Sequence, residues 1–223
     1  MPWHEAVTAH DRVIVLADAG LGKSWLIRTE TRRLASTALA QAEHDFAKVV
    51  IPVPLRCDQL AAADGPDLPS RAASFLAGQG LLAARARGPM TELIRAGRAV
   101  VLLDALDELT GDEAGIVRGL IESWSRRAGP QARCLITSRI AGYAGPPLPD
   151  AMEVELQPFT SGDVTQVIRA WQLPAAAERE LMGRANDPAV GDGPSPAPAR
   201  HAVCPSLRTA DGERTAAHQR RIV

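Results

Sequence analysis

Short apolar runs alternate with longer amphipathic stretches along most of the chain. The runs are rich in Val, Ile and Leu and too short for helices, so they are typical of buried strands. We expect strands over 12–17, 48–55, 99–104, 133–137 and 152–156. Apolar residues at helical spacing predict helices over 23–41, 89–96, 112–128 and from Ser161 onward, with shorter helices within 57–88. This alternation predicts an α/β fold with a mostly parallel sheet and helices on both faces.

The chain changes character from about Val190. The stretch 191–198 is built from Gly, Pro, Ser, Ala and Asp and cannot form the interior of a helix or strand. Beyond it the sequence shows no apolar periodicity. We therefore predict a disordered C-terminal tail over 190–223.

Composition narrows the class of protein. A length of 223 residues suits one domain, or one domain with a tail, and the net charge of −1 gives no electrostatic case for binding nucleic acid or an acidic membrane. No apolar run is long enough to span a membrane, and no secretory signal is recognisable. The cysteines, Cys57, Cys134 and Cys204, show no metal-ligand or disulfide spacing. The simplest location is a reducing cytoplasm.

The strongest chemical signal follows the first predicted strand. Residues 17–24, Ala-Asp-Ala-Gly-Leu-Gly-Lys-Ser, nearly match the phosphate-binding pattern G-x-x-x-x-G-K-[ST]. Backbone N–H groups of such a loop point at a phosphate, and the next helix adds its positive end. We expect the nucleotide-binding residues to be Asp18, Ala19, Gly20, Leu21, Gly22, Lys23, Ser24 and Trp25.

Two details of this loop bear on its function. Ala17 stands where the pattern has a glycine, so we expect this position to avoid the left-handed region. The plain alternative is a glycine-containing turn without a ligand. Against that, the chain has only two lysines, Lys23 and Lys48, and one of them falls where a phosphate lysine must be. Ser24 is then a candidate Mg²⁺ ligand.

A carboxylate ends the central predicted strand 99–104. At the carboxyl end of a parallel strand, Asp104 would point into the ligand crevice and hold Mg²⁺, through water. Asp107 or Glu108 could orient the attacking water or accept its proton, and spacing alone does not separate their roles. The alternative is a solvated acidic loop start. We expect the Lys23 and Asp104 strands to be adjacent.

Arg139 follows the next predicted strand, in Leu-Ile-Thr-Ser-Arg at 135–139. If that strand neighbours the Asp104 strand, the Arg139 guanidinium could stabilise charge on a transferred phosphoryl group. The alternative is an ordinary surface arginine, since the chain has 23 of them.

Four stretches together resemble the NACHT family of STAND-class P-loop NTPases: 17–24, 100–109, 135–139 and 156–160. The resemblance implies a three-layer P-loop NTPase fold that binds ATP or GTP with Mg²⁺ and hydrolyses it slowly. It implies that Lys23 and Ser24 are phosphate and magnesium ligands, Asp104 the magnesium carboxylate, Asp107 or Glu108 the catalytic acid, and Arg139 the γ-phosphate sensor. It further implies self-assembly of the full-length protein as a cytoplasmic signalling or defence switch.

The sequence departs from the family pattern in its phosphate loop and in its C-terminal part. Ala17 and Ala19 replace the usual glycine and proline. We expect a NACHT-like domain over 1–175, the start of a helical continuation over 176–189, and the tail, which suggests a truncated or frame-shifted piece of a longer protein. A non-catalytic remnant that binds nucleotide or a partner is the alternative function. A small-molecule kinase and a Ras-like GTPase fit less well, since no arginine-rich lid and no Asn-Lys-x-Asp occur.

Overall fold

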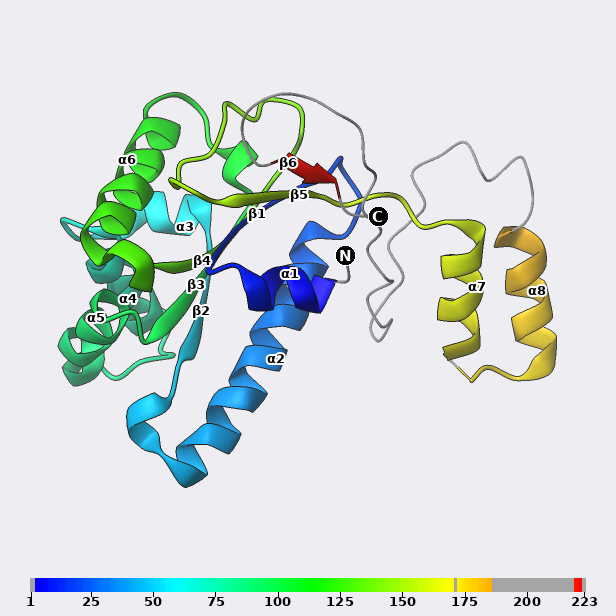
Figure 1. Cartoon of the computed structure of the whole chain (residues 1–223), viewed down its shortest axis with the longest axis horizontal. Coiled ribbons are helices and arrows are strands. Elements are labelled where there is room, and N and C mark those ends of the chain that lie inside the picture. Colours follow the sequence, from blue (N-terminus) through cyan, green and yellow to red (C-terminus); the bar gives the residue numbers. More distant parts are fainter. Residues whose placement is uncertain (1–2, 171, 186–218, 222–223) are drawn as a thin grey trace.

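A computed structural model describes residues 3–170, 172–185 and 219–221 (Figure 1). The strands are β1 (Arg12–Leu16), β2 (Ile51–Arg56), β3 (Ala99–Asp104), β4 (Arg133–Ser138), β5 (Met152–Glu155) and β6 (Gln219–Arg221). The helices are α1 (Trp3–Ala9), α2 (Lys23–His44), α3 (Cys57–Ala62), α4 (Leu68–Gly78), α5 (Arg87–Arg95), α6 (Gly111–Ala128), α7 (Ser161–Ala170) and α8 (Ala175–Ala185). Short 3-10 turns cover Phe46–Lys48, Ala84–Ala86, Leu106–Glu108 and Gly129–Gln131.

The described strands form one sheet in the order β2-β3-β4-β1-β5-β6, and every pairing is parallel. The predicted α/β fold is confirmed. The expectation that the Lys23 and Asp104 strands are adjacent is wrong, because β4 lies between β1 and β3. A parallel strand reached through a long crossover can insert at any open edge, so chain order does not fix which strand takes the centre.

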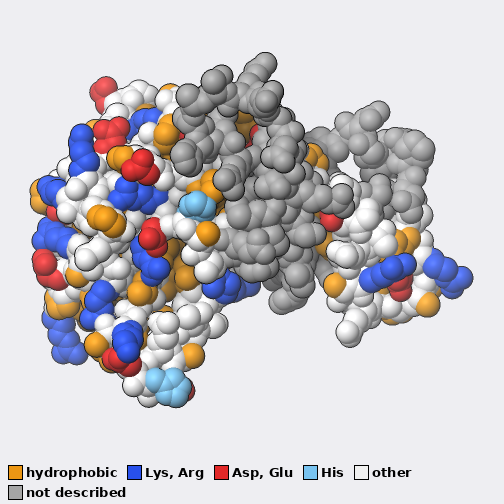
Figure 2. Space-filling model, viewed as in Figure 1, with side chains coloured by type: hydrophobic (Ala, Val, Ile, Leu, Met, Phe, Trp, Pro, Cys, Tyr) orange, Lys and Arg blue, Asp and Glu red, His pale blue; other side chains and the backbone are white. Residues whose placement is uncertain are grey.

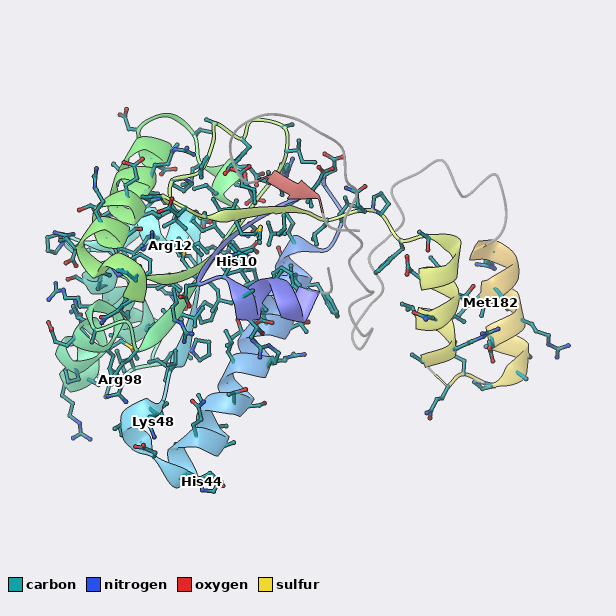
Figure 3. The ribbon with its side chains drawn as sticks, viewed as in Figure 1. His10, Arg12, His44, Lys48, Arg98 and Met182 are labelled. Carbon is teal, nitrogen blue, oxygen red and sulfur yellow. The ribbon has the colours of Figure 1, made fainter. Side chains whose placement is uncertain are left out.

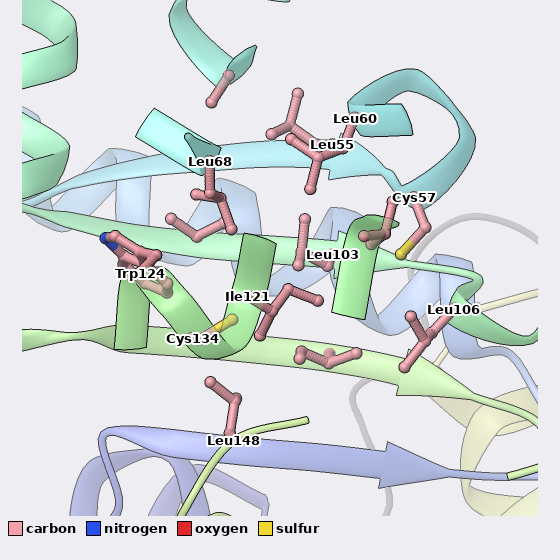
Figure 4. Packing of buried hydrophobic residues seen from close by; sticks show 14 of the residues in the cluster. Leu55, Cys57, Leu60, Leu68, Leu103, Leu106, Ile121, Trp124, Cys134 and Leu148 are labelled. Carbon is pink, nitrogen blue, oxygen red and sulfur yellow. The ribbon is translucent and has the colours of Figure 1, made fainter. Parts of the chain in front are cut away.

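Alternation along the strands builds the layers. In β1, Ile14 and Leu16 join a core with α3, α4, α5 and α6, whereas Val13 and Val15 join a second core with α1 and α2. Figure 4 shows the first core, where Leu103, Cys134 and Ile121 lie between the sheet and α6. The sheet therefore has helices on both faces, as a three-layer fold requires.

The five strands predicted before residue 160 all form, within a few residues of their expected bounds. β2 carries Pro52 and Pro54 and lies at the sheet edge, where a missing N–H costs least. α6 ends at Ala128 as predicted, with Gly129 as its C-cap. The helix α1 was not predicted; it buries Trp3 and Ala6 against the second core.

The C-terminal predictions have mixed outcomes. Most of the predicted disordered tail, 190–223, lies outside the described residues. Residues 219–221 are described, and there the structure differs from the prediction, since they pair with β5 as β6. The physical reason is that β5 presents an edge of backbone N–H and C=O groups that a further strand can satisfy.

Helices α7 and α8 contact one another and stand apart from the sheet core (Figure 1). The helical state of 175–185 fits the predicted helical continuation over 176–189, of which 186–189 lie outside the described residues. That this helix begins a further domain stays a prediction. Within the described part of the chain, no helix has the length and apolar character needed to cross a membrane.

Candidate functional site

The loop between β1 and α2 adopts the backbone that its glycines permit. Gly20 and Gly22 have φ of 83° and 87°, in the left-handed region that glycine enters without strain. Ala17 keeps a negative φ, as expected for an alanine in place of glycine. Its N–H donates to the Ser138 carbonyl at 3.2 Å, so the start of the loop is tied to the end of β4.

The loop is open to a ligand. Asp18, Ala19, Gly20 and Ser24 are exposed, and a side chain added at Gly20 would meet no atom within 4 Å. The first turn of α2 carries no acidic residue that would neutralise its positive end. The remaining members of the expected binding set are partly buried: Leu21, Gly22, Lys23 and Trp25. Loop and helix start together offer backbone N–H groups and positive charge to an anion.

Lys23 lies where charges from three strand ends meet. Its Nζ donates to the carbonyls of Ala17 at 2.8 Å and Asp18 at 2.9 Å. Burial lowers the Lys23 pKa from its usual value; Asp107 opposes this, Arg139 adds to it, and Asp104 and Asp18 oppose it. Charges from the ends of β3 and β4 therefore act on the β1 loop, although β1 and β3 are not neighbours.

Asp104 is buried and held by Thr137 of β4. The Thr137 hydroxyl donates to Asp104 Oδ1 at 2.5 Å and accepts from the Ala105 N–H at 3.0 Å. Ala105 has a φ of 63°, which is unusual for a residue with a side chain and turns the chain sharply after Asp104. In the sequence, Thr137 appeared only as part of the stretch 135–139; in the structure it orients the predicted magnesium carboxylate.

The side-chain oxygens near the loop suit a magnesium ion that is bound mainly by phosphate and water. Among the described residues, no group of three or more His, Cys, Asp or Glu side chains could hold a metal ion. Magnesium is commonly bound by one or two protein oxygens together with phosphate oxygens and water. The buried carboxylate of Asp104 and the exposed hydroxyl of Ser24 supply oxygens of that kind.

Asp107 and Arg139 form a closed pair. The Asp107 Oδ1 accepts from the Arg139 backbone N–H at 2.8 Å, and Oδ2 faces the Arg139 Nε at 3.0 Å. The Asp107 side chain is buried and that of Arg139 is half exposed. β3 and β4 are neighbours, which was the condition for Arg139 to reach the site. Both carboxylate oxygens of Asp107 are therefore engaged by Arg139.

Glu108 turns toward the other neighbour of β3. Its Oε2 lies 2.6 Å from a terminal guanidinium nitrogen of Arg56, the last residue of β2. The Arg56 Nε in turn faces Asp58 at 3.1 Å. Arg56 was not singled out in the sequence, because nothing distinguishes it there from the other arginines. Its position becomes visible only once β2 is paired in register with β3, opposite Asp104.

Comparison with known families identifies the family of the chain. The family model of the NACHT domain matches residues 11–173, which include all the loops described above. The chain belongs to the NACHT family. As a NACHT domain it is a nucleotide-binding P-loop NTPase. Members of this family generally bind nucleotide together with Mg²⁺. The match ends between α7 and α8, and the predicted domain boundary at 175 stays a prediction.

The chain was also compared with solved structures and with curated protein sequences. The Orc1 protein of Aeropyrum pernix, solved in complex with DNA, is similar to this NACHT domain with a TM-score of 0.46 and 17% identity. The similarity covers 78% of this chain and 51% of the other, so this chain spans about half the length of that structure. A search of curated protein sequences found no match.

Proposed function

We propose that this NACHT domain binds Mg-ATP or Mg-GTP at the β1–α2 loop, hydrolyses it slowly and acts as a nucleotide-dependent switch. The observation that carries the proposal is the charge cluster around Lys23. Asp104, Asp107 and Arg139, from two other strand ends, all affect the pKa of this ammonium group. A lysine in an exposed loop, with carboxylates near enough to act on its charge, is an arrangement suited to a triphosphate and its metal ion.

The roles follow from the contacts. The N–H groups of residues 18–25 and the Lys23 ammonium would bind the phosphates, replacing the loop carbonyls to which Lys23 now donates. Ser24 and Asp104 would hold Mg²⁺, which neutralises phosphate charge when bound. Thr137 keeps the Asp104 carboxylate in one orientation.

Hydrolysis would use the residues beyond the β3 end. Glu108 is the better candidate to accept the proton of the attacking water, since Asp107 is buried and engaged twice by Arg139. Arg139, held by Asp107, would stabilise charge that develops on the γ-phosphoryl group. This division of roles between Asp107 and Glu108 sharpens what the sequence left open.

Binding is tested by calorimetry with ATP and GTP, each with and without Mg²⁺. We expect Lys23→Ala to lower affinity by about a hundredfold or more, since it removes a charge-assisted contact to phosphate. Lys48→Ala is the matched control: Lys48 is exposed and pairs with Asp45 near the far end of α2 (Figure 3). Equal affinities of the two variants would refute nucleotide binding at this loop. The preferred base is read from the same titrations.

Hydrolysis is tested by measuring phosphate release from wild type, Glu108→Gln and Glu113→Gln. Glu113 is an exposed acid in the first turn of α6 and serves as the control. Loss of turnover in Glu108→Gln alone supports the assignment. Lys23-dependent binding with no turnover in wild type would favour the alternative, a domain that binds nucleotide without hydrolysis. The ion pair between Glu108 and Arg56 is the observation that supports that alternative.

The switch function, self-assembly in a full-length protein and a cytoplasmic location belong to the same proposal. Membership of the NACHT family supports the first two, and the cysteine pattern supports the third. Light scattering of the chain with and without Mg-ATP tests assembly of this domain directly. On the described part of the face shown in Figure 2, acidic and basic side chains are interspersed.

A further inference from the structure

Consecutive carboxylates after β3 are held in opposite directions. Asp107 is bound by Arg139, which follows β4, whereas Glu108 is bound by Arg56 at the end of β2. In the strand order β2-β3-β4-β1, β4 lies between β3 and the phosphate loop, and β2 lies on the far side of β3. Arg56 therefore draws Glu108 away from the side on which Lys23 lies.

We propose that Arg56 restrains Glu108 and slows nucleotide hydrolysis until this ion pair opens. The inference rests on the proposed function of Glu108 as proton acceptor and adds a residue that controls it. The Arg56 guanidinium donates to Glu108 Oε2, so this oxygen is occupied and not available to the attacking water until the pair opens. The pair also directs the carboxylate toward the sheet edge. Arg56 is thus a positioning residue, which acts through Glu108.

Local contacts fix Arg56 in this position. Its backbone N–H donates to Gln59 Oε1 at 2.9 Å, and its Nε faces Asp58 Oδ1 at 3.1 Å. The Gln59 N–H donates to the same Asp58 oxygen at 2.8 Å. The start of α3 therefore orients the guanidinium, and one of its two terminal nitrogens, Nη2, reaches Glu108 across the β2–β3 pair. The register of these strands, which places Arg56 opposite Asp104, makes that reach possible.

The restraint is built to be reversible. The Arg56 and Glu108 side chains are 44% and 43% exposed, so water competes for both partners. Exposed ion pairs of this kind contribute little, and the free energy needed to open one corresponds to about two- to fivefold in a rate or equilibrium. The expected effect on turnover is therefore modest and in one direction.

The experiment measures kcat and KM for Mg-ATP on the full chain. We expect Arg56→Gln to raise kcat about two- to fivefold and to leave KM unchanged, because Arg56 lies outside the phosphate loop. Arg56→Lys keeps the charge but cannot contact Asp58 and Glu108 together, so its kcat should lie between those of wild type and Arg56→Gln. Arg133→Gln is the matched control: its arginine is equally exposed, at 44%, and pairs with Asp11 at the other end of the sheet.

The outcomes separate this inference from the proposed function. Turnover that falls or stays unchanged in Arg56→Gln, while Glu108→Gln is inactive, overturns the restraint alone. Turnover that rises equally in Arg133→Gln also overturns it. A rise that disappears in the double variant Arg56→Gln/Glu108→Gln supports it. Wild-type turnover in Glu108→Gln overturns the proton-acceptor role, and with it this inference. No turnover in wild type and Arg56→Gln, with Lys23-dependent binding intact, refutes both hydrolysis and restraint.

Discussion

The two ends of the sheet use charged residues in different ways. At the amino end of the strands, Arg12 donates to the backbone carbonyls of Ala132 at 3.3 Å and Pro149 at 3.0 Å, and also to Gly129 (Figure 3). Arg98, just before β3, likewise donates to backbone carbonyls in the loop before β2. These arginines close the loops between helices and strands and need no added partner.

At the carboxyl end the charged side chains face one another around an open loop. The charges of Asp107, Arg139 and Asp104 act on the pKa of Lys23. The Lys23 ammonium itself contacts carbonyls of its own loop. The first turn of α2 carries no acidic residue of its own. The comparison teaches that a high arginine content says little by itself. What distinguishes a ligand site from a structural one is whether charge and backbone donors are already satisfied.

The largest effect should come from Thr137→Val, a substitution of similar shape. It leaves the buried Asp104 carboxylate and the Ala105 N–H without their shared hydroxyl, and we expect a loss of about 2–4 kcal/mol in the free energy of unfolding. Denaturant unfolding measures it. Thr91→Val is the control, since the Thr91 hydroxyl returns to a carbonyl of its own helix and should cost at most about 1 kcal/mol. Equal losses would contradict a special role for Thr137.

Next in size is Arg12→Ala at the amino end. We expect it to lower the free energy of unfolding by about 2 kcal/mol, because it removes charge-assisted contacts to three loop carbonyls. Affinity for Mg-ATP, measured by calorimetry, should not change. Arg139→Ala should instead reduce turnover, with a smaller loss of stability than Arg12→Ala, since Arg139 is half exposed and the backbone N–H at position 139 would still bind the buried Asp107 carboxylate. A drop in nucleotide affinity for Arg12→Ala would erase the distinction between the two ends.

A smaller effect is expected from Gly20→Ala in the phosphate loop. Space is not the obstacle, because the added carbon would meet no atom within 4 Å. The obstacle is the backbone, because Gly20 has a φ of 83°. Holding alanine in that conformation costs about 1 kcal/mol, which should appear as weaker Mg-ATP binding and a lower Tm. Gly119→Ala in the middle of α6 also meets no atom and should stabilise the protein by about 0.5–1 kcal/mol. If Gly20→Ala stabilised it too, the backbone argument would fail.

The smallest effect is a pH dependence of nucleotide affinity at alkaline pH. Burial lowers the pKa of Lys23 in the free protein, and a bound polyphosphate would raise it again. The complex then binds the proton more tightly, so affinity should fall as pH rises from the free-protein pKa, which lies below 10.5, toward that of the complex. One proton limits the slope to about tenfold per pH unit. Lys23→Arg stays charged, and an unaltered slope in this variant would assign the effect elsewhere.

Local pattern predicted much of the fold. The run 99–103 is entirely apolar and 134–136 forms a short apolar centre, which is why strands could be placed there within a few residues. The exit of β1 into a glycine loop and helix could be predicted for the same reason: it depends on neighbours in sequence. Ala17 kept a negative φ, as expected from its side chain alone.

What could not be predicted depends on contacts between distant segments. The insertion of β4 between β1 and β3 joins residues more than thirty positions apart in the chain. Thr137 as the partner of Asp104, and Arg56 as the partner of Glu108, follow only from strand register. The separate surroundings of Asp107 and Glu108 likewise arise from opposite neighbours of β3. Adjacent acidic residues in a sequence carry no sign of such a difference.

The central place of β4 also has a consequence for how the protein is made. Residues 17–24 leave the ribosome early, but β1 can pair with β4 only when residues 133–138 have been synthesised. The edge of β3 that does not face β2 pairs with the same strand and must also wait for it. Until then the lysine-bearing loop and the aspartate strand have nothing to hold them together. A nascent chain that stops short of Ser138 would lack an assembled site, and long-range pairing of this kind sets a slow step in folding.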